Sequence, residues 1–170
     1  IFIIIKMKPE ITAAEKKQIL EKLLQNLRKS RYIHNISGNY YKKLNMRFIL
    51  PSIIITSISG MASFLSTAEF LDNNEKNGFS VLVGVFASVS TMLQAFSGAF
   101  GFDTKREMFL KAADDYDKLM SKVKFEIMYP NEENFIENVE KDIINIQNNC
   151  KFLPPDWVLE QWTTIKNEKN

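Results

Sequence analysis

The sequence of 170 residues contains only one cysteine and one histidine, and it is also poor in glycine, with 6, and in proline, with 5. A single cysteine excludes an internal disulfide framework, and one histidine with one cysteine excludes a His/Cys zinc site built within one chain. So few glycines and prolines exclude a fibrous or low-complexity protein. The sequence also lacks a P-loop, a glycine-rich dinucleotide fingerprint, an HExxH motif and a nucleophile elbow. We therefore predict no catalytic residue, no metal site and no cofactor.

Charge is missing from two long stretches of the chain. Residues 48–68 form a run of 21 residues without a charged side chain, and residues 78–102 form another of 25. The formal net charge of +2 conceals this pattern, because it balances +8 over residues 1–47, −2 over 69–77 and −4 over 103–170. The basic residues are mostly lysines without an aromatic or glycine-rich partner motif, so we predict no nucleic-acid partner.

An uncharged helical run of about 20 residues matches the roughly 30 Å hydrocarbon core of a bilayer. We therefore predict transmembrane helices over residues 48–68 and 78–102, joined by a short external loop over 69–77, with a lipid bilayer as partner. The alternative is a buried hairpin inside a soluble bundle. It is disfavoured because soluble core helices of this length nearly always carry charge on one face.

The basic residues that flank the two runs predict the orientation of this hairpin. They lie just before the first run and just after the second: Lys42, Lys43, Arg47, Lys105, Arg106 and Lys111. The connecting loop has a single lysine, Lys76. By the positive-inside rule we expect an integral membrane protein with both termini cytoplasmic.

The N-terminal part of the sequence supports further predictions. We interpret residues 1–8 as a translated leader that is not native coding, with Met7 as the start. Residues 9–47 are expected to form N-terminal cytosolic helices, the first opened by a capping box that begins at Thr12. Gly38 is expected to break the chain there, and a new helix then runs into the first span.

The rear of the chain, residues 103–152, has apolar residues at alternating steps of three and four, which predicts two seams of an antiparallel helical hairpin. Residues 153–170 are expected to form a short helix and tail. The seams could hold one chain together or join the subunits of a homo-oligomer. They comprise Phe109, Ala113, Tyr116, Met120, Val123 and Ile127, followed by Ile136, Val139, Ile143 and Ile146. The predicted fold class is thus an all-α membrane protein: a two-helix transmembrane hairpin with cytosolic amphipathic helices that form an antiparallel helical hairpin or bundle.

Polar side chains recur at helical spacing inside both predicted spans. They could line a water-filled path in an oligomer, or they could pack between helices and form hydrogen bonds there. An unpartnered amide in lipid is unfavourable, so Gln94 should face protein or water. The first stripe comprises Ser52, Thr56, Ser59, Ser63 and Ser66, and the second comprises Ser90, Gln94 and Ser97. A separate face of small residues is predicted to pack against the first span: Gly84, Ser88, Thr91, Ala95 and Gly98.

The single histidine, the single cysteine and the two tryptophans are predicted to have structural roles. His34 is predicted to be a surface or interfacial residue, and Cys150 a small core residue that ends the second seam. Trp157 and Trp162 are predicted to dock the tail on the bundle.

The order of these parts resembles the SLATT superfamily of two-transmembrane effector domains, which are associated with nucleotide-second-messenger and nucleotide-sensing systems. The resemblance covers residues 20–165 and rests on this architecture, on the opening Thr104-Lys105-Arg106-Glu107, on the segment 112–119 and on the Pro-Pro-Asp-Trp tail at 154–157. It implies a membrane effector that oligomerises and permeabilises membranes when a partner signals. No sensor domain is fused to this sequence, so we expect either that the trigger acts in trans or that the effector role has been lost. Members also occur in large DNA viruses and protists, so the resemblance admits a viral source.

Two functions from different classes follow. One is a pore-forming effector that assembles as a homo-oligomer. The other is a non-conducting structural anchor, in a virion or organelle membrane, whose cytosolic helices hold a partner protein.

Overall fold

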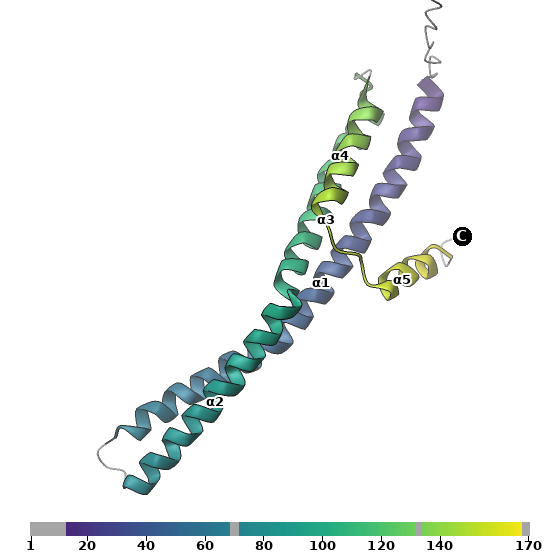
Figure 1. The fold of residues 1–170 in the computed structure, drawn as a ribbon. Helices are drawn as coiled ribbons and strands as arrows, with labels where there is room; N and C mark the ends of the chain where they lie inside the picture. Colours follow the sequence, from purple (N-terminus) through teal and green to yellow (C-terminus); the bar gives the residue numbers. More distant parts are fainter. Residues whose placement is uncertain (1–12, 69–71, 132–133, 168–170) are drawn as a thin grey trace, which may run out of the picture. The chain divides into compact units, whose positions relative to one another are not determined.

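The computed structural model describes residues 13–68, 72–131 and 134–167, and over these residues the chain contains helices and no strand (Figure 1). The predicted all-α fold is therefore confirmed for this part of the chain. The interpretation of residues 1–8 as a leader, and Thr12 of the predicted capping box, lie outside the described residues. The helices are α1 (Ala13–Ser66), α2 (Asn73–Phe100), α3 (Phe102–Met128), α4 (Phe135–Asn149) and α5 (Asp156–Asn167).

The chain divides into two compact units. We call residues 36–110 the hairpin unit, because it contains α2 and the adjoining parts of α1 and α3. We call the described residues of 13–35 and 111–167 the bundle unit. Both α1 and α3 contribute residues to each unit.

The expected break at Gly38 is wrong, because α1 continues through it without interruption. A Cβ placed on Gly38 would lie 2.7 Å from Leu110 Cδ2 and 3.3 Å from the Leu110 backbone nitrogen. The missing side chain therefore allows α1 and α3 to approach closely within the hairpin unit. Glycine in a helix costs roughly 0.5–1 kcal/mol relative to alanine, which the surrounding long helix tolerates.

In the hairpin unit, α2 has well-defined ends. Asp72 and Glu75 form a capping box at its start: the Asp72 carboxylate accepts the N–H of Asn73 at 2.8 Å, and Glu75 accepts the N–H of Asp72 at 3.2 Å. At its other end Gly101 has φ 59°, a left-handed conformation that glycine adopts without strain. Because α3 begins at the next residue, α2 passes directly into α3.

In the bundle unit, α3 and α4 pack against each other and against the first part of α1. Contacts between α3 and α4 pair Lys122 with Asp142 and Tyr116 with Gln147, so the two helices run antiparallel, as predicted. The shared core buries apolar side chains from all three helices: Leu20, Leu27, Tyr116, Leu119, Met120, Val123, Phe135, Val139 and Ile146. Burial of this kind is the main favourable term for the unit.

The short helix α5 closes the bundle unit. Val158 is fully buried, and the Trp162 ring lies 5.3 Å from the ring of Tyr32 on α1. Trp162 therefore docks the tail as predicted, whereas Trp157 is 43% exposed.

Candidate functional site

The most prominent feature of the hairpin unit is apolar surface that the chain does not cover. Both α1 and α2 contain a stretch long and apolar enough to cross a membrane, and only 17% of the α1 stretch and 6% of the α2 stretch are buried. Met61 and Phe64 on α1 are 70% and 77% exposed, and Met92 on α2 is 61% exposed. A core helix of a soluble protein would bury such side chains, and exposed apolar areas of this extent mark interaction surfaces.

A polar network fills the contact between α1 and α2. The Ser90 hydroxyl oxygen lies 2.8 Å from that of Ser52 and 2.7 Å from that of Thr56. Gln94 Nε2 donates to Ser52 Oγ at 2.8 Å. Ser52 and Ser90 are 2% and 4% exposed, so their hydroxyls are shielded from the surroundings. The hairpin thus pairs its central polar groups with one another, as helices packed in lipid commonly do.

A second polar contact joins α1, α2 and α3. Ser97 Oγ donates to Asn45 Oδ1 at 2.6 Å, and Asn45 Nδ2 donates to Asp103 Oδ1 at 3.3 Å. Asn45 is buried. Asn45 is not a member of the predicted stripe, although Asn45, Ser52 and Ser59 repeat every seven residues and therefore share one helix face.

The remaining members of the predicted stripes lie elsewhere. Ser59 is buried and donates to the Val83 carbonyl oxygen at 3.4 Å, so it also faces α2. Ser63 is exposed, and Ser66 Oγ donates to the Ser63 carbonyl within its own helix at 2.7 Å. The first stripe therefore packs against α2 only as far as Ser59.

The face of small residues on α2 does not pack against α1, contrary to prediction. All five of its members are exposed: Gly84, Ser88, Thr91, Ala95 and Gly98. A Cβ added to Gly84 or Gly98 would meet nothing within 4 Å. The polar stripe of Ser90, Gln94 and Ser97 occupies the contact instead, because its side chains find hydrogen-bond partners on α1.

Aromatic rings gather where α2 meets α3. Tyr41 stacks on Phe109 with ring centres 5.6 Å apart, and Phe102 lies 5.6 Å from Phe48 and 5.4 Å from Phe100. Tyrosine and tryptophan are enriched where membrane helices meet the headgroup region. The rings hold together residues that are about 60 positions apart in the sequence.

The predicted seams are filled within one chain. Phe109, Ala113, Tyr116, Met120, Val123, Val139 and Ile146 are buried. Ile127, Ile136 and Ile143 are half-buried and pack against the bundle core. The spacing allowed these residues either to hold one chain together or to join subunits. Their contacts in this structure are those of an intramolecular core.

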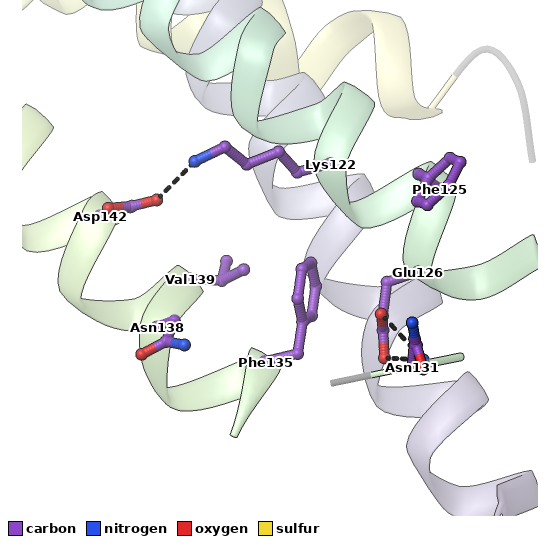
Figure 2. A pocket seen from close by; sticks show the side chains of 8 residues that line it. All are labelled: Lys122, Phe125, Glu126, Asn131, Phe135, Asn138, Val139 and Asp142. Carbon is purple, nitrogen blue, oxygen red and sulfur yellow. Dashed lines mark hydrogen bonds and ion pairs between the residues drawn. The ribbon is translucent and has the colours of Figure 1, made fainter. Parts of the chain in front are cut away.

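The bundle unit has a cleft of about 740 Å³ between α3 and α4 (Figure 2). In this view Phe135 and Val139 lie between two polar pairs. On one side, Lys122 Nζ is 3.3 Å from Asp142 Oδ2. On the other, the buried Glu126 carboxylate accepts the N–H of Asn131 at 3.3 Å. The Lys122–Asp142 pair joins α3 to α4, and the Asn131 contact joins α3 to the loop that follows it.

Glu126 is a buried charge that the sequence analysis did not single out. Lys16 Nζ lies 2.8 Å from its Oε1, which links α1 to α3, and the Asn131 contact holds the chain where it leaves α3. Burying a carboxylate is unfavourable unless it is paired and hydrogen-bonded, and Glu126 has both kinds of partner. These partners indicate a structural role for Glu126.

His34 is half-buried, in place of the predicted surface or interfacial position. Its ring centre lies 5.2 Å from that of Tyr116, and its Nδ1 is 2.7 Å from the Ser30 carbonyl oxygen. Burial lowers the pKa of His34 below 6.5, although the Ser30 contact opposes this change. Burial likewise raises the pKa of Tyr116 and that of Cys150, which packs against the core at the end of α4.

Among the residues that the structure describes, no group of three or more His, Cys, Asp or Glu side chains is placed to hold a metal ion. Comparison with protein-family models, with curated proteins and with solved structures gave no match. Function must therefore be inferred from the hairpin and its surfaces.

Proposed function

We propose that this chain is an integral membrane protein whose hairpin unit spans the bilayer and anchors the bundle unit. The observation that carries the proposal is the distribution of polarity around α1 and α2. Many apolar side chains of their membrane-length stretches are exposed, whereas Ser52, Ser90 and Gln94 form hydrogen bonds between the two helices. Lipid would cover the exposed side chains, and each Å² of apolar surface removed from water contributes about 25 cal/mol.

The role we favour is that of a non-conducting anchor or scaffold with both termini on the cytoplasmic side. A pore needs polar side chains that face water along its path. In this hairpin the central hydroxyls and the Gln94 amide are engaged with each other. In the bundle unit, exposed apolar and aromatic side chains lie in the last turn of α3 and directly after it: Phe125, Met128 and Tyr129. They suit a partner protein held in trans.

A pore-forming homo-oligomer is the second candidate. The exposed face of α2 from Gly84 to Gly98 favours it, because small residues allow helices of different copies to approach closely, and hydroxyls such as those of Ser88 and Thr91 could face water. The resemblance to SLATT effectors adds weight to this candidate.

Insertion and topology are tested together by cysteine labelling of the full chain. Cys150→Ser provides a background without thiols, into which Asn74→Cys or Lys111→Cys is introduced. A membrane-impermeant maleimide should label Asn74→Cys from outside intact cells and Lys111→Cys only after permeabilisation. Complete extraction of the protein by alkaline carbonate would refute membrane insertion.

Conductance separates the two candidates. Purified oligomers of known mass, reconstituted into dye-loaded vesicles, should cause no leakage if the protein is an anchor. Leakage that Thr91→Leu suppresses, while Ile54→Leu leaves it unchanged, would favour the pore.

A further inference from the structure

We infer that one end of the hairpin unit binds the headgroups of anionic phospholipids. The binding surface, which we call the basic collar, consists of Lys42, Lys43, Arg47, Lys105 and Arg106. The inference rests on the proposed membrane insertion and goes beyond it, because insertion alone requires no particular headgroup.

The two ends of the hairpin unit differ in charge. At the end where α2 begins, the described charged residues are Asp72, Glu75 and Lys76. At the other end the five basic residues of the collar are accompanied by only two acidic ones, Asp103 and Glu107. The collar end therefore has a net positive charge directly beside the apolar helices.

The fold brings the two halves of the collar together. Lys105 Nζ lies 5.6 Å from the centre of the Tyr41 ring, within the range of a cation–π contact. The Asn45 amide donates to Asp103, and Phe48 stacks on Phe102. These contacts place residues 42–47 of α1 beside residues 102–106 of α3, so the basic residues of both helices lie at the same end of the hairpin unit.

Three of the basic groups are available to a ligand. Lys42, Lys43 and Arg47 are exposed, and within the described part of the chain they form no ion pair. Arg106 is partly engaged, because its guanidinium lies 3.0 Å from Asp103.

The position of the collar beside apolar side chains favours a lipid headgroup over a soluble anion as the ligand. Phe96 and Phe100, at the end of α2 beside it, are about half exposed, so the basic groups adjoin side chains suited to the edge of the hydrocarbon region. A cluster of four to eight Lys and Arg residues immediately cytoplasmic of a transmembrane helix attracts anionic lipids. A soluble polyanion would gain nothing from the adjoining apolar surface.

The test measures which lipids the full-length protein retains. The protein is released from micelles that contain equal amounts of phosphatidylcholine and phosphatidylserine, and the bound lipids are quantified by native mass spectrometry. We expect the unmodified chain to retain phosphatidylserine in preference by roughly tenfold or more. The triple variant Lys42→Gln, Lys43→Gln and Arg47→Gln should lose this preference.

The matched control removes the same charge from the bundle unit, with Lys17→Gln, Lys22→Gln and Arg28→Gln, which are exposed. It should keep the preference. No preference in a protein that resists carbonate extraction overturns the collar inference and leaves the anchor proposal standing. Equal losses in both triple variants also overturn the inference, since the effect would then follow total charge. A protein that carbonate extracts overturns both proposals.

Discussion

The hydroxyl oxygens of Ser52 and Ser90 lie 2.8 Å apart between α1 and α2, and the Ser90 hydroxyl also lies 3.3 Å from the Ser52 carbonyl oxygen. Two small side chains in contact allow the helix backbones to approach closely. Because Thr56 and Gln94 join the same hydroxyls, one register of α1 against α2 satisfies all four side chains. The pair therefore specifies how the hairpin closes.

Ser90→Ala is expected to weaken this closure. The substitution removes a hydroxyl shared by Ser52 and Thr56, and interhelical hydrogen bonds in membranes contribute about 0.6 kcal/mol on average and up to about 1.7. Ser88→Ala is the control, because its hydroxyl is exposed and donates to Gly84 in its own helix. Unfolding in mixed micelles with increasing dodecyl sulfate measures both free energies. Equal losses for the two variants would contradict the role of the Ser52–Ser90 pair.

Gly38→Ala is expected to destabilise the hairpin unit, although alanine is normally the better helix former. The new Cβ would come within 3 Å of two Leu110 side-chain atoms, and overpacking of this kind typically costs about 1–3 kcal/mol. Gly60→Ala, on the same helix, meets open space and should be neutral or slightly stabilising. Thermal melting followed by circular dichroism compares the two. A higher melting temperature for Gly38→Ala would show that α1 and α3 do not approach closely there.

Tyr116→Asp is expected to unfold the bundle unit rather than to separate subunits. The side chain is 1% exposed and contacts the core, so an aspartate there would leave a charge buried without a partner. Ile144→Asp, on the exposed side of α4, should have little effect on folding. Helix content and detergent-corrected mass distinguish the outcomes. A well-folded Tyr116→Asp variant of lower mass would instead place the seams between subunits.

Glu126→Gln is expected to destabilise the bundle unit by about 1–3 kcal/mol, because it weakens a buried acceptor that holds both Lys16 and the N–H of Asn131. Asp142→Asn breaks the exposed pair with Lys122 and should cost at most about 1 kcal/mol. Urea unfolding of the full chain in detergent, followed by the fluorescence of the tryptophans, measures both. Equal effects would mean that burial of Glu126 is unimportant.

Much of this architecture follows from patterns that depend only on nearby residues. Charge-free runs marked α2 and the second part of α1, and apolar spacing marked the seams of α3 and α4. Heptad spacing could not decide whether Tyr116 faces its own chain or another, because both arrangements bury the same side chains. In the bundle unit Tyr116 packs against residues of its own chain.

The failures share a physical cause. Gly38 looks like a helix breaker by propensity, yet its role depends on Leu110, more than 70 residues away. Small residues and hydroxyls on α2 are both suited to helix packing, so composition alone did not show which face α1 would contact. Glu126 resembled any solvated acidic residue, because its partner Lys16 lies 110 positions earlier. In each case a distant contact, absent from local sequence, determines the outcome.

Acidification is expected to destabilise the bundle unit through His34, the single histidine of the chain. Burial lowers the pKa of the folded His34 below its ordinary value of 6.5, so as the pH falls through 6.5 the unfolded chain binds a proton that the folded chain resists. Stability therefore falls with pH in this window, since the unfolded state holds more protons. His34→Gln should flatten the decline between about pH 7 and pH 5, below which carboxylates begin to titrate. Unfolding free energies at several pH values measure the slope, and an unchanged slope in His34→Gln would assign the pH dependence to other groups.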